Sequence, residues 1–299
     1  MPKIPIMAHK SGFVNIIGNP NVGKSTLMNA LVGERLSIIT SKAQTTRHRI
    51  LGIVNEEDYQ IVFSDTPGII KPAYELQTSM MDFVKTAFED ADILIYMVEI
   101  GETGLKDENF FEKIRNTNIP VILVLNKIDR SEQKILEEQM EYWSEKVPNA
   151  LIHPISALEN FNVHELKEEI VRLLPECPPY FPKDQLTDKP ERFFVNETIR
   201  EKILMLYKKE IPYAVEIETE SFKEEENIIR IRSVIMVERD TQKGIIIGHK
   251  GASLKKVGTE ARKDLEKFFG KKIFLDLYVK VNKNWRSSNR ELRRFGYKE

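Results

Sequence analysis

The sequence has very little cysteine and no long apolar run. Cys177 is the only cysteine among 299 residues, so no disulfide can form within the chain and a reducing, cytosolic setting is the simplest interpretation. No stretch of about 18 apolar residues occurs, so we expect no membrane-spanning helix. The first ten residues, MPKIPIMAHK, lack the apolar core of a secretory signal. These absences predict a soluble, cytoplasmic protein, which we expect to be a monomer.

The charged residues are unevenly distributed, although the net charge is only −1. Residues 243–299 contain 16 Lys and Arg against 6 Asp and Glu, a net charge of +10, and residues 1–242 carry the balance of −11. Such a split indicates that the carboxy-terminal end meets a polyanion.

Proline marks a boundary within the chain. Five of the 14 prolines fall between Pro175 and Pro190, where they disfavour both helix and strand. The length also suggests two domains. We therefore predict a first domain over residues 1–175, a linker over 176–190, and a second domain over 191–299.

The two sides of the linker have different patterns. Before it, short apolar runs alternate with amphipathic segments, which predicts a mostly parallel, doubly wound α/β sheet. After it, we expect a small α+β domain of order α-β-β-α-α-β, followed by a basic terminal helix. The strands expected in the first domain are 13–17, 50–54, 60–63, 93–98, 121–125 and 151–155, and its helices include 26–32, 76–88, 132–146 and 163–174.

A phosphate-binding loop follows the first expected strand. Residues 18–25, GNPNVGKS, match the pattern G-x-x-x-x-G-K-[ST] between a strand and a helix. In such loops the backbone amides and the helix N-terminus bind phosphate oxygens, Lys24 reaches the β- and γ-phosphates, and Ser25 holds Mg²⁺. The expected nucleotide-binding residues of this segment are Asn19, Pro20, Asn21, Val22, Gly23, Lys24, Ser25 and Thr26.

Two further segments complete the phosphate side of the site. Residues 65–68, DTPG, follow the third expected strand, where Asp65 would organise the magnesium ion and the amide of Gly68 would meet the γ-phosphate. The segment 41–47, SKAQTTR, lies where the first switch belongs, and a threonine there would complete the magnesium site. We favour Thr46, with Thr45 as the alternative. Lys24, Thr46, Asp65 and Gly68 are thus the expected catalytic residues.

Residues 126–129, NKID, predict guanine recognition. They follow an apolar strand, and ligands bind beyond the carboxyl ends of strands in such sheets. Asp129 can accept hydrogen bonds from N1–H and the exocyclic amine of guanine, a pair that adenine does not offer. Asn126 and Lys127 accompany it, and Ser156 and Ala157 would supply an amide to the base oxygen. The four segments in this order resemble the translation-factor-type GTPases.

One position departs from the Ras-like pattern. Ile69 stands where Ras-like enzymes place a water-orienting glutamine, so intrinsic hydrolysis should be slow or depend on another group. Asn21 resembles the asparagine that binds K⁺ in a subset of GTPases. A monovalent cation near Asn21 would then supply the positive charge that an arginine finger supplies elsewhere.

The second domain contains a glycine loop of the kind that clamps RNA. Residues 248–251, GHKG, match the GxxG loop with which KH domains hold about four nucleotides of single-stranded RNA. We expect the apolar residues Ile245–Ile247 to form a floor for bases. The expected RNA-binding residues are Lys243, Gly248, His249, Lys250, Gly251, Lys255 and Lys256.

Taken together, the segments SKAQTTRHRI, FSDTPGI, NKID, IGHKG and LYVKVNKNWR resemble the Era family over nearly the whole chain. The resemblance implies a phosphate-loop GTPase domain with a type II KH domain. It also implies GTP, GDP and Mg²⁺ as ligands, and a bacterial GTPase that binds small-subunit ribosomal RNA near its 3′ end and assists maturation of that subunit. Peripheral association with the inner membrane is a further implication.

Two alternatives stay open from the sequence. The terminal helix, with Trp285, Leu292 and Phe295 on one side, is expected to pack on the KH sheet, but a contact with RNA or a membrane surface is the other interpretation. The chain could also be an RNA-binding scaffold with an inert nucleotide site. GTP turnover with and without RNA distinguishes that scaffold from a GTPase.

Overall fold

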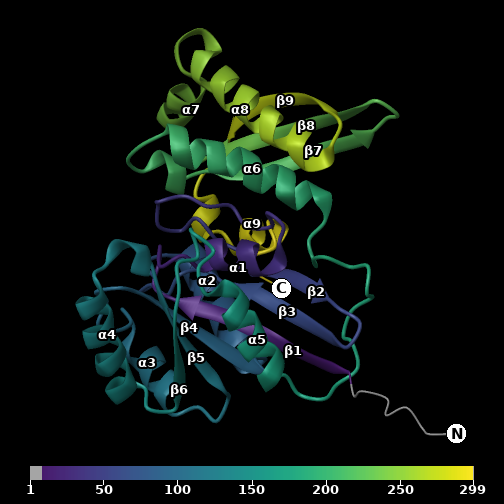
Figure 1. Ribbon diagram of the computed structural model, residues 1–299. Coiled ribbons are helices and arrows are strands. Elements are labelled where there is room, and N and C mark those ends of the chain that lie inside the picture. The colour runs from purple at the N-terminus through teal and green to yellow at the C-terminus, as the bar shows by residue number, and fades with distance from the viewer. Residues whose placement is uncertain (1–8, 299) are drawn as a thin grey trace, which may run out of the picture. The chain divides into compact units, whose positions relative to one another are not determined.

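The computed structural model describes residues 9–298, which form two compact units (Figure 1). The first unit contains the chain up to Ser37, Thr46–Ala73 and Met80–Asp188. The second contains Lys189 to the C-terminus together with the short segments Ile38–Thr45 and Tyr74–Ser79. Two segments from the amino-terminal half of the sequence therefore pack with the carboxy-terminal half.

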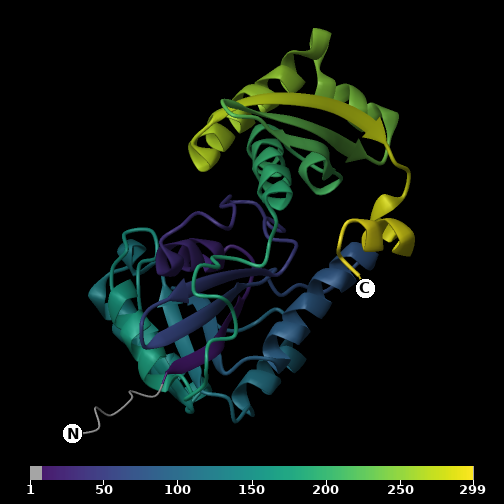
Figure 2. The same cartoon turned by 90° about the vertical axis from the view of Figure 1, so that its right-hand side faces the viewer.

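The first unit is built on a six-stranded sheet of order β2-β3-β1-β4-β5-β6, with helices on both of its faces (Figures 1 and 2). All neighbouring strands are parallel except β2, which runs antiparallel to β3. The doubly wound prediction is confirmed. The strands are β1 (Lys10–Gly18), β2 (Ile50–Asn55), β3 (Tyr59–Asp65), β4 (Ile93–Glu99), β5 (Val121–Asn126) and β6 (Ala150–Pro154).

The helices of the first unit agree with the amphipathic segments, with one addition. The additional helix, α3, buries Phe110, Phe111 and Ile114, and the Asp107 carboxylate caps it by accepting from the Phe110 amide at 3.1 Å. The helices are α1 (Lys24–Val32), α2 (Glu75–Glu89, whose first turns belong to the second unit), α3 (Glu108–Arg115), α4 (Gln133–Lys146) and α5 (Val163–Leu173).

The proline-rich segment is irregular, as expected, but it is anchored along the edge strand β2. The amide of Ile53 donates to the Leu186 carbonyl at 2.8 Å, and the Thr187 hydroxyl donates to the Leu51 carbonyl at 2.7 Å. The side-chain oxygen of Gln60 accepts from the Tyr180 amide at 2.8 Å. We call residues 175–188 the strap, because backbone and side-chain hydrogen bonds hold this segment on the first unit.

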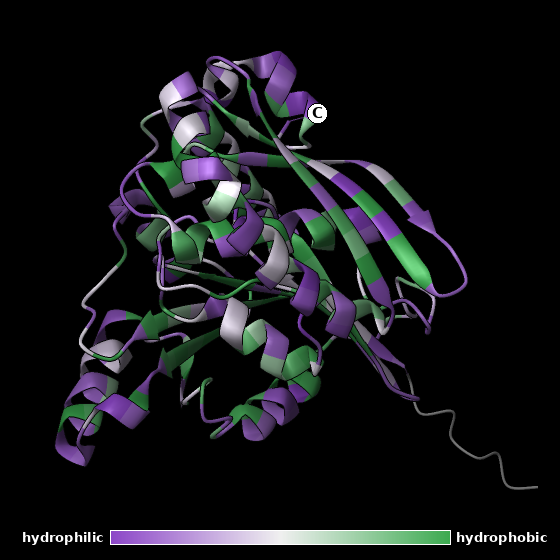
Figure 3. Ribbon diagram, turned by 90° about the horizontal axis from the view of Figure 1, so that it is seen from above, coloured by the Kyte–Doolittle hydropathy of each residue, from purple (hydrophilic) through white to green (hydrophobic). Residues whose placement is uncertain are grey.

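The second unit contains a three-stranded sheet of order β7-β8-β9, in which β7 and β8 are antiparallel and β8 and β9 are parallel. Apolar side chains from α6, α7 and α8 form its core with one face of the sheet. The strands alternate between hydrophilic and hydrophobic residues (Figure 3), which is the pattern of a half-buried sheet. The elements are α6 (Glu191–Leu206), β7 (Glu216–Glu224), β8 (Ile228–Val237), α7 (Asp240–Ile247), α8 (Ala252–Phe269), β9 (Lys272–Val281) and α9 (Asn289–Arg294).

The expected α-β-β-α-α-β order of the second domain is thus confirmed, and its terminal helix packs within the unit. Trp285 and Leu292 are fully buried, and the Trp285 indole N–H donates to the Ala214 carbonyl at 3.1 Å. The Tyr297 hydroxyl donates to the buried carboxylate of Glu216 at 2.8 Å. The apolar side of this helix is therefore occupied by the protein itself.

Candidate nucleotide and RNA sites

The phosphate loop joins the end of β1 to the start of α1, as its motif requires. Lys24 is 6% exposed, and its ammonium donates to the carbonyls of Gly18 at 3.2 Å and Asn19 at 2.8 Å. Burial lowers the pKa of Lys24 to about 8, while the charges of Asp65 and Glu102 oppose that shift. The loop therefore curls around its own lysine, and a bound phosphate would replace carbonyl oxygens as the partner of that ammonium.

Three oxygen-bearing side chains meet beside the loop. The Ser25 hydroxyl donates to Asp65 Oδ2 at 2.7 Å and lies 2.9 Å from Thr46 Oγ1, and Thr46 Oγ1 lies 3.3 Å from Asp65 Oδ2. Oxygen ligands of Mg²⁺ at about 2.1 Å lie about 3.0 Å from one another in an octahedron. The three residues thus have the chemistry and the spacing that a magnesium ion needs.

Asp65 is fully buried, and desolvation raises the pKa of its carboxyl, against the hydrogen bond from Ser25 and the charge of Lys24. A buried carboxylate is costly without a cation close to it. This burial therefore favours cation binding at the position where Ser25, Thr46 and Asp65 converge.

Thr45, the alternative switch threonine, has other partners. Its hydroxyl lies 2.6 Å from Thr40 Oγ1 and donates to the Lys42 carbonyl at 2.6 Å. These local bonds belong to the second unit, whereas Thr46 lies with Ser25 and Asp65 in the first. The geometry supports Thr46 as the magnesium ligand.

The DTPG turn touches the phosphate loop directly. A Cβ atom on Gly68 would lie 2.6 Å from the Cα of Pro20, so only glycine allows this approach. The Ile69 amide donates to the Gly18 carbonyl at 3.0 Å, and its side chain is 1% exposed. Ile69 is thus a core residue, which agrees with the expectation that it cannot orient water.

The base-recognition segments are joined by Asn126, which is buried. Its side-chain amide donates to the Val22 carbonyl at 2.8 Å, and its side-chain oxygen accepts from the Ala157 amide at 2.9 Å. Asn126 therefore ties the phosphate loop to the segment after β6. Its geometry is that of a brace between two nucleotide-binding loops.

Asp129 and Lys127 follow Asn126 and are partly exposed. One oxygen of Asp129 accepts from the Ser156 hydroxyl at 2.6 Å, which fixes the carboxylate. The Lys127 ammonium donates to the Asn21 carbonyl at 2.8 Å and pairs with Glu99. Residues of NKID thus contact the phosphate loop and the segment after β6, as a shared nucleotide site requires.

Two loop asparagines have distinct settings. The Asn19 side chain is 4% exposed and binds the segment after β4, donating to the Gly104 carbonyl at 2.9 Å and accepting from the Lys106 amide at 3.1 Å. The Asn19 side chain therefore braces the phosphate loop against that segment. Asn21 is exposed and has a positive φ of 67°, at the tip of the loop.

In the second unit, the GxxG loop connects α7 to α8. Gly248 has a φ of 70°, and a Cβ there would lie 2.2 Å from Ser253 Oγ, so glycine is required. His249 and Lys250 are exposed between the two glycines. The glycines thus leave the backbone of the loop open to close approach by a ligand, and the loop carries the cationic side chain of Lys250 at its tip.

A groove of about 540 Å³ lies between α8 and β9, beginning at Gly251. Lys255 lines it, whereas Lys256 is exposed outside it and Lys243 lies on α7. Sequence reasoning missed most of the lining, although Leu254, Gly258 and Arg262 follow the four-residue spacing of one helix face. The lining residues not predicted are Leu254, Gly258, Thr259, Arg262, Leu275, Asp276 and Leu277.

The expected apolar floor from Ile245–Ile247 is wrong for its central residue. Ile246 is fully buried in the core of the second unit, because α7 turns that side toward the sheet, and Ile247 packs against the same core. Ile245 is half exposed. The apolar walls of the groove come instead from Leu254, Leu275 and Leu277.

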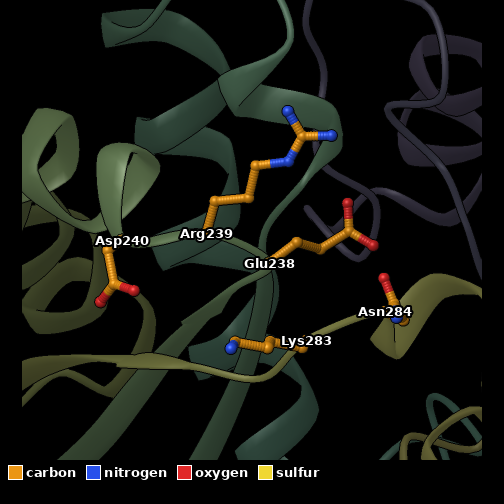
Figure 4. Close-up of a pocket in the computed structure, with 5 residues that line it drawn as sticks. All are labelled: Glu238, Arg239, Asp240, Lys283 and Asn284. Carbon is orange, nitrogen blue, oxygen red and sulfur yellow. The ribbon is translucent and has the colours of Figure 1, made fainter.

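A second hollow of about 330 Å³ lies where β8 ends and α7 begins. The ends of its lining side chains diverge rather than converge on one point (Figure 4). Opposite charges are mixed around it, so it does not favour a ligand of either sign. The lining residues are Glu238, Arg239, Asp240, Lys283 and Asn284.

Comparison with known proteins covers both units. A family model described as "50S ribosome-binding GTPase" matches residues 13–127, and a model described as "KH domain" matches residues 210–286. Within residues 9–298, no helix combines the length and apolarity needed to cross a bilayer.

Curated relatives and a solved structure match almost the whole chain. GTPase Era of Clostridium kluyveri is 45% identical over 291 residues, which are 97% of this chain and 99% of the relative. GTPase Era of Staphylococcus haemolyticus is 46% identical over 293 residues, 97% of this chain and 98% of the relative. A crystal structure of Era with MgGDPNP and nucleotides 1506–1542 of 16S ribosomal RNA is 40% identical, with a TM-score of 0.92, and covers 97% of this chain and 100% of its own. With the phosphate-loop and KH folds both present and relatives of this similarity along its length, the chain belongs to the Era family of GTPases.

Proposed function

We propose that this GTPase binds small-subunit ribosomal RNA near its 3′ end and assists maturation of the small subunit, with RNA binding coupled to its nucleotide state. The observation that carries the proposal is the likeness, over 97% of the chain, to an Era crystallised with a GTP analogue and a 16S ribosomal RNA fragment. The alternative of a scaffold with an inert nucleotide site does not agree with membership of a GTPase family.

At the nucleotide, the positions of Lys24, Ser25, Thr46 and Asp65 support the roles proposed for the phosphate side of the site. The loop amides and Lys24 would bind the phosphates. Ser25, Thr46 and Asp65 would hold Mg²⁺, which supplies charge neutralisation at the β- and γ-phosphates. Gly68, in contact with the phosphate loop, would present its amide to the γ-phosphate.

The base would be bound by a separate group of residues. Asp129, fixed by Ser156, would accept from guanine, and the Ala157 amide would donate to the base oxygen. Asn126 and Lys127 would hold the surrounding loops. Since Ile69 is buried and apolar, the attacking water would have to be oriented by another group, and we expect slow turnover in the absence of RNA.

RNA should stimulate GTP turnover if the two activities are coupled. Adding a 16S RNA fragment of nucleotides 1506–1542, the segment in the solved Era complex, should raise turnover clearly above the rate measured without RNA. Phosphate release at saturating GTP measures it. Lys24→Ala should abolish turnover with and without RNA. If turnover at saturating RNA equalled turnover without RNA, the proposed coupling would be contradicted. If the protein did not bind the RNA at all, the proposed RNA-binding function itself would be contradicted.

Potassium should also stimulate hydrolysis, if Asn21 holds a monovalent cation. Asn21 lies at the exposed tip of the phosphate loop, where such an ion would face the phosphates. We expect turnover to be about tenfold faster in KCl than in NaCl, because fixed positive charge stabilises the transition state. Asn21→Ala should remove the difference. The result against this proposal is an equal rate in both salts for the parent protein.

Three other properties stay predictions. The cytoplasmic location and the monomeric state are expectations from the sequence, and the peripheral attachment to the inner membrane rests on the family resemblance.

A further inference from the structure

The sheet of the second unit has a side that its helices do not cover. Along β8 and β9, alternate residues point away from the core formed with α6, α7 and α8. Near Glu216 and Met236 this side is buried, and Tyr297 donates to Glu216 there. Farther along the strands it is exposed. We call this exposed part the open face, and it carries Lys223, Arg230, Arg232, Lys272, Phe274, Asp276 and Tyr278.

Two arginines of the open face stack on aromatic rings. The guanidinium carbon of Arg230 lies 5.6 Å from the ring centroid of Phe274, and that of Arg232 lies 5.0 Å from the ring centroid of Tyr278. Phe274 is 52% exposed, and the side chains of Arg230 and Arg232 are 50% and 58% exposed. A large aromatic side chain exposed to this extent in the middle of a strand contributes little to the fold.

The chemistry of these pairs fits single-stranded RNA. An exposed ring offers a surface on which any base stacks, and a guanidinium beside it donates to phosphate and adds cation–π attraction. Phe274 and Tyr278 are four residues apart on one strand, about 13 Å, so they can serve more than one nucleotide.

The two arginines of the open face have carboxylate partners, and the net charge of the face is close to balanced. Asp276 lies 3.6 Å from Arg232, and Glu225 at the strand end pairs with Arg230 at 3.0 Å. Glu220 interacts with Tyr278. Both ion pairs are about half exposed, and pairs of this kind hold their partners weakly. A phosphate can therefore compete for either arginine.

The open face is continuous with the groove beside the GxxG loop. Leu275 and Leu277 line the groove from one side of β9, and Phe274 and Tyr278 lie on the other side of the same strand. Asp276, which also belongs to the open face, lines the groove as well. Because β9 is an edge strand of the sheet, nothing in the order of strands separates the two surfaces. An RNA strand leaving the groove needs only to cross this edge.

We propose that the open face is a second RNA-contact surface, on which nucleotides that flank the segment in the groove stack on Phe274 and Tyr278 and neutralise Arg230 and Arg232. The proposal rests on the proposed RNA-binding function. The open face would then strengthen the binding of longer RNAs. This added affinity would depend little on RNA sequence, because stacking and phosphate contacts do not read base edges.

The test compares RNAs of different length on the full-length protein. A nested set is made from the 1506–1542 fragment of 16S RNA by trimming each end in steps of about four nucleotides, the length that a KH groove clamps. Some of the RNAs will be the shortest that the parent still binds. The variant R230A/F274A should bind these short RNAs with the same affinity as the parent. It should bind the longest RNA about tenfold more weakly, in line with the loss of one stacked base and one cation.

Salt dependence gives a second, independent readout. For R230Q/R232Q, the slope of log affinity against log salt on the longest RNA should be shallower by about 1.4, since each phosphate contact to a single strand contributes about 0.7. On the shortest RNA the slope should equal that of the parent. A merely structural effect of the substitutions would change both RNAs alike.

The matched control is K189A/F193A, which removes one cation and one ring that also lie in a cation–π arrangement, 5.6 Å apart, at the start of α6. It should bind every RNA as the parent does. If the parent binds the whole RNA set and R230A/F274A matches it at every length, the open face is not an RNA surface and the inference is overturned. If the parent binds no RNA, the proposed function fails first. Unchanged melting temperature and RNA-free GTP turnover verify that the variants are folded.

Discussion

Asp129→Asn should bind GTP about 100-fold more weakly than the parent and should gain affinity for xanthosine triphosphate. The carboxylate is positioned by the Ser156 hydroxyl at 2.6 Å, and would accept two hydrogen bonds from guanine. Each hydrogen bond to a charged group contributes about 1.5–3 kcal/mol. The substitution removes the negative charge of the carboxylate and replaces one of its two acceptor oxygens with an amide, which accounts for the weaker binding. Xanthine presents an oxygen in place of the exocyclic amine, and the asparagine amide can donate to it.

Equilibrium titration with fluorescent GTP, GDP and xanthosine nucleotides measures this change of preference. Asp82→Asn provides a matched control, because it makes the same chemical change on an exposed carboxylate of α2. It should leave both affinities as they are. Parent-like GTP affinity in Asp129→Asn would remove Asp129 from the base site.

Reversing the charge of the GxxG loop should have the largest effect on RNA. In His249→Asp/Lys250→Asp, two carboxylates would stand between the two glycines, where the proposed site would receive RNA phosphates. We expect RNA affinity to fall about 100-fold or more at moderate salt, because phosphate contacts dominate affinity and repulsion replaces them. GTP affinity should not change, because the loop belongs to the second unit and the phosphate loop to the first.

Filter binding at two salt concentrations, with GTP affinity measured in parallel, decides the outcome. Lys208→Asp/Lys209→Asp is the control, since it reverses two adjacent exposed cations elsewhere in the second unit. RNA-stimulated turnover should disappear together with binding in the loop variant only. If the loop variant bound RNA like the parent, the basic segment Arg286–Arg294 would be the next candidate, although Arg286 and Arg294 already pair with Glu238 and Glu218.

The segments of the candidate nucleotide site could be recognised in the sequence because each of them is a short contiguous string. The phosphate loop, DTPG and NKID each carry their own spacing, and parallel strands bring their ends to one edge of the sheet. The choice between Thr45 and Thr46 needed the structure, since adjacent threonines have the same sequence signature. Their hydrogen bonds separate them: Thr46 lies with Ser25 and Asp65, and Thr45 bonds within its own segment.

The groove beside the GxxG loop could be predicted only in part, because two elements that are distant in the sequence form it. The GxxG loop is local, but Leu254 and Arg262 come from α8, and Leu275 and Leu277 come from β9. Each of these residues also fits an ordinary amphipathic helix or strand, so no pattern marks them as lining. Ile246 was misplaced for the same reason, since a run of three isoleucines does not show which one faces the core.

The strap covers the edge strand β2 of the sheet in the first unit. Strand β2 ends the sheet, and an unpaired outer strand is a template to which another chain can add. Here the bonds of Ile53 with Leu186 and of Leu51 with Thr187 already occupy outward-facing groups of that strand. The prolines on either side of these bonds cannot donate backbone hydrogen bonds, so the strap itself is a poor template for pairing with another strand. A GTPase fragment that is cut after Leu174 would lack the strap, and its edge strand β2 would be exposed to pairing with another chain. A fragment that ends at Asp188 would keep this strand covered.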